Sequence, residues 1–241
     1  MYPTNSAKAF ALVIITCLIG TKTLSQDKGY IGLGFGGSTP LGSFASTDPN
    51  NEDAGFATIG LSIDLSFGYK LGERFGLAAL IRSQANGVDA QAIADQLVLP
   101  GYTVTVEAGN YAMGGFFVGG YGSFPISGKL DLDTRGLIGF ASTSSPTYNI
   151  RYSAMGVGDV LTFKQTSATG GAFAYNLGAG LRWNVGRKVC LVWMLDYMGT
   201  NPEFEFTLTN IDGTATRSRY DQPITTFNSS ISIGYRFGSG S

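Results

Sequence analysis

Apolar and polar residues alternate without a break between Thr58 and Leu71. Isoleucine, leucine, phenylalanine or tyrosine occupies every odd position from 59 to 71, and small or polar residues or a lysine occupy the positions between them. A period of two sends all the apolar side chains to one face of a β-strand, which a helix cannot do. The segment is also long, because strands in soluble proteins usually have about five or six residues. The pattern therefore predicts one long strand with an apolar face and a polar face.

Seven further segments carry similar apolar sets, so the chain is predicted to be an all-β protein with eight strands. The predicted strands cover residues 29–36, 58–71, 75–84, 111–122, 129–140, 172–185, 189–198 and 225–237. The segment 111–122 is rich in glycine, and its phase is ambiguous. Beyond the N-terminal region, no apolar run is long enough to form a membrane-spanning helix.

The connections between these strands alternate between short and long. Residues 72–74, 123–128 and 186–188 are short turns, whereas residues 37–55, 85–110, 141–171 and 199–224 are long and polar. Outer-membrane barrels have this arrangement, with the short turns in the periplasm. We therefore predict an eight-stranded antiparallel up-and-down transmembrane β-barrel with short periplasmic turns and long extracellular loops. Within the second long loop, residues 88–98 can form a short helix.

The short turns also predict how neighbouring strands pair. A three-residue turn at 72–74 sets Leu65 against Ile81 on the apolar face. The same register sets Asp64 against Arg82 on the polar face. A slip of one residue would invert a whole strand, so this agreement between like faces supports the predicted pairing.

The polar face of the predicted barrel carries eight charged residues, four acidic and four basic. They are Asp64, Asp131, Asp133, Asp196, Arg82, Arg135, Arg182 and Arg236. The interior of an eight-stranded barrel is just wide enough for side chains to fill. Paired charges there would bond to one another and obstruct a water path, and Val192 and Met194 would add apolar bulk. The set predicts a polar plug, and the alternative is the filter or gate of a small channel.

Alternation alone does not decide which face lies outside, because a soluble lipocalin-like carrier would turn its apolar face inward around a ligand. Aromatic residues near both ends of the apolar face favour the membrane orientation, since they form interfacial belts. The predicted belts are Tyr69, Phe75, Tyr121, Phe124, Trp183, Tyr235 and Phe237 on the turn side, and Tyr111, Phe173, Tyr197 and Phe227 on the loop side. The polar face is rich in Gly, Ser and Asn rather than Lys and Glu, which suits a narrow interior.

Residues 1–25 have the features of a secretory signal peptide. A lysine precedes an apolar stretch at 9–20 that is too short to cross a bilayer as a helix, and small residues stand at positions 23 and 25. A lipoprotein signal at Cys17 is the weaker alternative. The barrel is predicted to cover residues 26–237, followed by a C-terminal overhang at 238–241.

Three segments resemble proteins with an outer-membrane β-barrel domain, although the strand pattern as a whole is the stronger likeness. These segments are PLGSFAS at 40–46, NPEF at 201–204 and SIGYRF at 232–237. The mature chain resembles the small eight-stranded family that includes the transmembrane domain of OmpA and OmpX. The resemblance implies an integral protein of the outer membrane, in contact with lipid and lipopolysaccharide. It also implies that Tyr235 and Phe237 act as a signal for the barrel-assembly machinery.

Composition argues against several activities. The 241 residues include no histidine and their formal net charge is −1. Most enzymes on barrels of this kind use a histidine as acid or base. A Ser–Lys or Asp–Asp design is the alternative, but no spacing singles one out, so no catalytic residue, cofactor or metal is predicted. No basic run suggests nucleic-acid binding. We expect a non-enzymatic protein that anchors surface loops for adhesion, host contact or envelope integrity, through an unknown surface partner; a small porin for ions or polar solutes is the alternative.

Three local features resemble binding or reactive sites but have simpler structural interpretations. GLGFGG at 32–37 lacks the Lys-Ser/Thr pair of a phosphate loop and is predicted to be a strand end. DPNNED at 48–53 could hold a divalent cation, but its spacing is not that of an EF-hand and a solvated loop is favoured. Cys190 would be the only cysteine of the mature chain and is expected to be a small buried residue.

Overall fold

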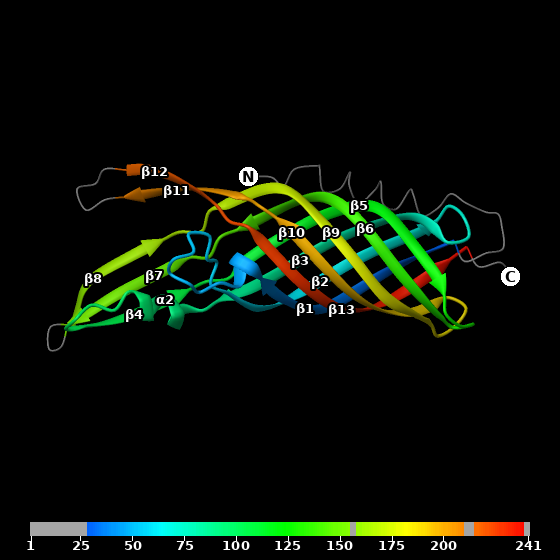
Figure 1. Cartoon of the computed structure of the whole chain (residues 1–241), viewed down its shortest axis with the longest axis horizontal. Helices are drawn as coiled ribbons and strands as arrows, with labels where there is room; N and C mark the ends of the chain where they lie inside the picture. The colour runs from blue at the N-terminus through cyan, green and yellow to red at the C-terminus, as the bar shows by residue number, and fades with distance from the viewer. Residues whose placement is uncertain (1–27, 155–157, 210–214, 239–241) are drawn as a thin grey trace, which may run out of the picture.

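Eight long antiparallel strands close into a barrel (Figure 1). The computed structural model describes residues 28–154, 158–209 and 215–238, so the predicted signal peptide and residues 239–241 lie outside the described residues. The barrel strands are β1 (Gly29–Leu41), β2 (Ala57–Lys70), β3 (Phe75–Val88), β5 (Tyr111–Pro125), β6 (Leu130–Ser144), β9 (Thr169–Asn184), β10 (Val189–Thr200) and β13 (Ile224–Phe237). β1 pairs with both β2 and β13, which closes the ring.

The predicted fold class and strand register are confirmed. Leu65 pairs with Ile81, and Asp64 pairs with Arg82. Several strands are longer than predicted at their loop ends, because hydrogen-bonded pairing continues through polar residues beyond the last apolar pair. β1, for example, reaches Leu41 rather than ending at residue 36.

The outer surface of the barrel is apolar and the lumen is polar. Phe35, Leu77 and Ile233 on the outer face are 63%, 55% and 67% exposed, whereas Asp64 and Asp196 in the lumen are 2% and 0% exposed. A water-soluble protein rarely exposes a continuous apolar band of this kind. The surface therefore requires a hydrocarbon environment around the barrel.

Tyr111 and Tyr121 do not belong to the predicted aromatic belts. Both are 4% exposed and face the lumen, whereas Phe116 and Val118 of the same strand face outward at 50% and 44% exposure. Both phases of this strand contain glycine, so its sequence does not select a face. Pairing with β3, which sets Phe116 against Ile81, fixes the phase that the sequence leaves open.

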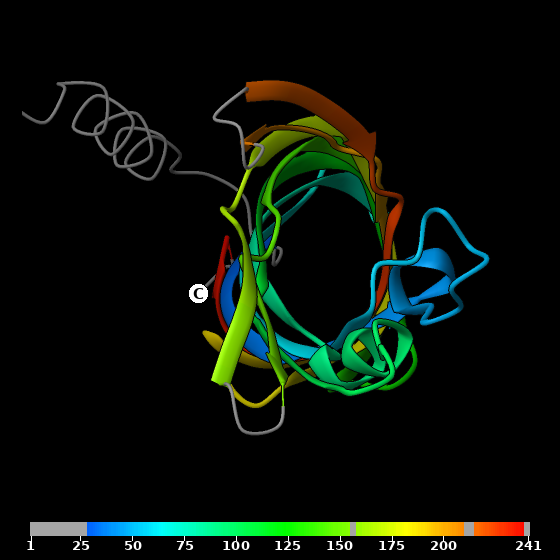
Figure 2. The ribbon, with the colours of Figure 1, turned by 90° about the vertical axis from the view of Figure 1, so that its left-hand side faces the viewer.

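The long loops contain more secondary structure than predicted. β4 (Tyr102–Ala108), β7 (Tyr148–Ala154) and β8 (Gly158–Gln165) form a three-stranded sheet, and β11 (Glu203–Thr209) pairs with β12 (Ala215–Asp221). The sequence analysis assigned no strands to these long polar connections. Seen along the axis, the three-stranded sheet and the β11–β12 hairpin stand over different parts of a closed ring (Figure 2).

Two short helices complete the loop end of the barrel. The helix expected within residues 88–98 is present as α2 (Ala90–Gln96), and Asp89 caps it by accepting a hydrogen bond from the Ala92 amide at 2.9 Å. A 3-10 turn, η1 (Gly42–Ala45), follows β1. Among the described residues, no helix is long and apolar enough to cross a membrane.

Candidate functional site in the barrel lumen

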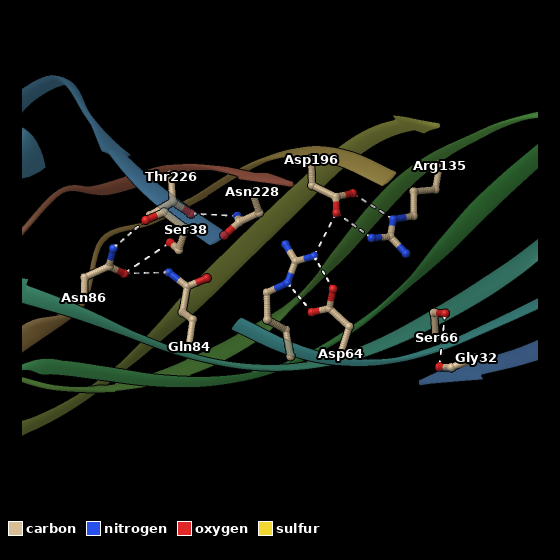
Figure 3. Close-up of polar contacts among 11 residues, drawn as sticks. Gly32, Ser38, Asp64, Ser66, Gln84, Asn86, Arg135, Asp196, Thr226 and Asn228 are labelled. Carbon is tan, nitrogen blue, oxygen red and sulfur yellow. Dashed lines mark hydrogen bonds and ion pairs between the residues drawn. The ribbon is translucent and has the colours of Figure 1, made fainter. Parts of the chain in front are cut away.

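Four charged side chains form one connected group in the middle of the lumen, which we call the quartet: Asp64, Arg82, Arg135 and Asp196. Arg82 donates from Nε to Asp64 Oδ1 at 2.6 Å and from Nη2 to Asp64 Oδ2 at 3.0 Å. The same Nη2 donates to Asp196 Oδ2 at 2.8 Å. The dashed lines of Figure 3 trace these contacts. Arg82 thereby joins two carboxylates on different strands.

Asp196 is shared between two arginines. Arg135 donates from Nε to Asp196 Oδ1 at 2.9 Å and from Nη2 to Oδ2 at 2.6 Å (Figure 3). Two Asp and two Arg make the quartet neutral, and bidentate geometry of this kind is the strong form of the Arg–carboxylate contact. Charges this deeply buried are retained only when they are paired, so each member depends on the others.

The quartet crosses the full width of the lumen. Asp64, Arg82, Arg135 and Asp196 come from β2, β3, β6 and β10 respectively. β3 and β10 are four places apart in the ring of eight strands, so they lie on opposite walls. The contact between Arg82 and Asp196 therefore spans the barrel from wall to wall.

A second charged group lies nearer the short turns. Arg182 contacts Asp131 Oδ2 and Asp133 Oδ2, each at 3.0 Å, and donates to Ser123 Oγ at 2.8 Å. Its guanidinium carbon also lies 5.6 Å from the centre of the Tyr30 ring, within cation–π range. The structure thus places a second layer of paired charges below the quartet.

The eighth charged residue, Arg236, lies nearest the turn end of its strand, β13. It is partly exposed and donates from Nη1 to the Gly186 carbonyl at 3.1 Å. Of the two residues proposed as an assembly signal, Tyr235 is 50% exposed on the outer face. Phe237 stacks against Phe67 with ring centres 5.8 Å apart.

Neutral polar side chains line the lumen between the quartet and the loop end, and the sequence analysis did not single them out. Asn86 Oδ1 accepts from Ser38 Oγ at 3.2 Å and from Gln84 Nε2 at 3.3 Å (Figure 3). Asn228 Nδ2 donates to Thr226 Oγ1 at 3.0 Å. The sequence does contain a signal for these residues, because polar residues recur at alternate positions along these strands. The sequence analysis noted only the charged residues among them.

Side chains from the loops cover part of the barrel mouth. Phe44 of η1 is 1% exposed and packs edge-on against Tyr111, whose hydroxyl donates to the Gly55 carbonyl at 3.2 Å. Above them, burial raises the pKa of Tyr148 to about 12, with Tyr220 close by. Tyr148 therefore stays a neutral phenol at physiological pH.

Gly178 makes room for the quartet, and its substitution gives a direct test. A Cβ at this position would collide with Asp196 Oδ1 and lie 3.2 Å from Arg135 Cγ. Gly178→Ala is expected to lower the free energy of unfolding by about 1–3 kcal/mol, as overpacking does. Urea titration of the folded protein in vesicles measures this change.

Gly120→Ala is the matched control, because a Cβ there meets nothing within 4 Å. This control is expected to leave the unfolding midpoint unchanged within error. Equal midpoints for Gly178→Ala and the wild type would contradict the close packing around the quartet.

The three features given simpler structural interpretations lie in a loop and on two barrel strands. Among the described residues, no group of three or more His, Cys, Asp or Glu side chains could hold a metal ion. The acidic loop is organised by its own turns, such as the contact from the Asn50 amide to Asp48 Oδ1 at 2.9 Å. Residues 32–37 lie within β1, and Cys190 is fully buried.

Comparison with known proteins finds similarity of fold. No family model and no curated protein sequence matches the chain. Among solved structures, Ail, the attachment invasion locus protein of Yersinia pestis, is 14% identical with a TM-score of 0.45, covering 88% of this chain and 100% of that chain. A major outer membrane protein from Thermus thermophilus is 12% identical with a TM-score of 0.49, covering 87% and 99%. OprG from Pseudomonas aeruginosa is 11% identical with a TM-score of 0.47, covering 88% and 97%.

The class of protein follows from the chain's own surface and lumen. The sheet is closed, its outer face is apolar, and its lumen contains paired charges and amides. Only a closed barrel satisfies every backbone hydrogen bond of a sheet within lipid. The chain is a small transmembrane β-barrel of the outer-membrane type.

Proposed function

We propose that this protein is a non-enzymatic barrel of the outer membrane that anchors extracellular β-structure for contact with other surfaces or for envelope integrity. The quartet carries the proposal, because it joins opposite walls of the lumen through paired side chains. Side chains paired in this way obstruct a water path along a lumen of eight strands. The parts that remain available for function are the three-stranded sheet, the β11–β12 hairpin and the loops around them.

The proposal includes a cellular route and several partners. Residues 1–25 direct export, and the barrel-assembly machinery reads Tyr235 and Phe237. The outer surface contacts lipid and lipopolysaccharide, and the extracellular sheets contact a surface partner whose identity is open. No nucleic acid, cofactor or catalytic residue is part of the proposal.

Planar-bilayer conductance of the refolded protein tests the closed lumen. Only material with a heat-dependent shift in gel mobility is used, so that silence cannot be due to unfolded protein. We expect no discrete conductance steps from the wild type. Stable, reproducible steps would overturn the closed barrel.

A small channel is the second candidate, and one observation favours it. Several buried polar atoms on the loop side of the quartet have no hydrogen-bond partner, among them Ser62 Oγ, Gln84 Oε1 and Asn228 Oδ1. Such a lining suits water or polar solutes, with the quartet as a gate.

Arg82→Ala and Asp64→Ala separate the two candidates. We expect both variants to remain silent in planar bilayers, because the Arg182 group adds a second layer of paired charges nearer the short turns. A new conductance in either folded variant would favour the gate.

A further inference from the structure

A cleft lies where the three-stranded sheet leaves the barrel. Its volume is about 430 Å³, which falls in the usual range for small-molecule sites. Residues from all three strands and from the bends beneath them line it, including Glu107, Asn149, Lys164, Thr147, Thr166 and Gly109. None of these residues belongs to the lumen groups described above. We call this cleft the crease.

Three of these side chains form a row across the sheet. Glu107 of β4 pairs with Asn149 of β7, and Asn149 pairs with Lys164 of β8. Because side chains alternate between the faces of a strand, all three lie on one face of the sheet, opposite the face of Tyr148 and Ile150. The row presents a carboxylate, an amide and an ammonium side by side.

The carboxylate in this row is already satisfied within the protein. Glu107 Oε2 accepts from Asn149 Nδ2 at 3.0 Å, and Oε1 pairs with Arg151 Nη2. Arg151 does not line the crease but offsets the charge of Glu107, so Glu107, Arg151 and Lys164 together have a net charge of +1. Lys164 is exposed and has no ion-pair partner among the described residues.

The remaining lining suits a hydroxylated ligand. Thr147 and Thr166 contribute exposed hydroxyl-bearing side chains. The contact with Glu107 fixes the Asn149 amide so that its Oδ1 is left buried and without a partner. Gly109 packs closely against Thr147, since a Cβ there would lie 2.8 Å from Thr147 Oγ1.

The crease also lies at a definite height above the membrane. Phe140 and Phe173 are the last large apolar residues exposed on the outer face of β6 and β9. Beyond them comes a hydroxyl pair, Ser144 and Thr169, whose side-chain oxygens lie 3.1 Å apart. With about 3.3 Å per residue and a strand tilt near 40°, the crease is roughly 15–20 Å above this apolar edge. With the extracellular placement proposed above, this height lies beyond the hydrocarbon core, on the side of the outer leaflet's headgroups.

We propose that the crease binds an acidic sugar, a phosphorylated or carboxylated hexose, carried by the glycolipid that surrounds the barrel. Lys164 pairs with the acidic group, and the threonine hydroxyls and the Asn149 amide bond to sugar hydroxyls. The assignment to a membrane-borne sugar rests on the extracellular placement proposed above. Binding of a soluble acidic sugar does not depend on that placement. The binding chemistry and the extracellular placement can therefore fail separately.

Titration with glucosamine 6-phosphate tests the chemistry of the crease. The refolded protein is held in detergent micelles, and amide resonances are followed by NMR. Saturable shifts are expected at residues 107–109, 147–149 and 164–166. Lys164→Ala is expected to weaken the apparent Kd at least about five-fold, because it removes the unpaired ammonium while the exposed position tolerates alanine.

Two controls make this titration decisive. Lys129→Ala removes the same charge from an exposed position at the opposite end of the barrel and is expected to leave the Kd unchanged. Inorganic phosphate is expected to compete poorly. The acidic-sugar site is overturned by an absence of saturable shifts, by equal Kd values for Lys164→Ala and the wild type, by a loss equal to that of Lys129→Ala, or by phosphate competing as well as the sugar.

A second arm identifies the source of the sugar. The protein is placed in vesicles that contain either lipid A alone or lipid A with a phosphorylated core oligosaccharide. The core-bearing glycolipid is expected to raise the apparent Kd for the soluble probe at least about five-fold, and Lys164→Ala is expected to remove that difference. Equal Kd values in the two vesicles would assign the crease to a soluble sugar and overturn the membrane-borne one.

Discussion

Replacement of Leu65 by arginine is expected to block most of the barrel from assembling in lipid vesicles. Leu65 lies on the outer face, 38% exposed, between Leu33 of β1 and Ile81 of β3. An arginine facing lipid near the bilayer midplane costs about 2–4 kcal/mol. The folded fraction is measured from the heat-dependent shift in gel mobility after refolding into vesicles.

Thr105→Arg controls for the introduced side chain itself. Thr105 is an exposed strand residue of the extramembrane sheet, so the same substitution there meets water rather than lipid. We expect wild-type assembly from this variant. Assembly of Leu65→Arg at the wild-type level would contradict the lipid-facing surface, and so would failure of Ser66→Arg in the lumen together with success of Leu65→Arg.

Asp196→Ala is expected to lower the free energy of unfolding by about 3–5 kcal/mol, the range seen when one partner of a buried ion pair is removed. Asp196 is fully buried and accepts hydrogen bonds from both Arg82 and Arg135. Its loss leaves one arginine without a carboxylate partner and the other with only Asp64. Urea unfolding in vesicles, followed by tryptophan fluorescence, measures the change.

Glu107→Ala is the matched control for this prediction. Its ion pair with Arg151 is exposed, with side chains 57% and 36% accessible. Exposed pairs contribute about 0–1 kcal/mol, so this variant should unfold near the wild-type urea concentration. If Asp196→Ala cost no more than Glu107→Ala, the quartet would not be the structural centre of the lumen.

The barrel itself could be predicted because its signal is repeated and redundant. Alternation in β2, β9 and β13 selects one face, and the short turns then fix which strands pair. The lumen contact between Asp64 and Arg82 followed from this register alone. The sharing of Asp196 by Arg82 and Arg135 did not, because it depends on closure of the ring and on side-chain reach across it.

Other features escaped prediction for identifiable physical reasons. Glycine at both phases of β5 removed the pattern that would have placed Tyr111 and Tyr121 in the lumen. Val104 and Val106 alternate with threonines in β4, as in a strand. The segment has only seven residues and lies within a polar loop, so this pattern was too short to distinguish a strand from a loop. The crease could not be predicted at all, since its row forms only when β4 of one loop aligns with β7 and β8 of another.

Depth-dependent quenching of the two tryptophans tests the membrane-spanning orientation most directly. Trp183 and Trp193 are both on the outer face, 52% and 47% exposed, and they are the only tryptophans of the chain. In vesicles of lipids brominated along the acyl chains, we expect strong quenching of their fluorescence and little quenching by aqueous iodide. Strong quenching by iodide with none by brominated lipid would place the apolar face in water and contradict the transmembrane barrel.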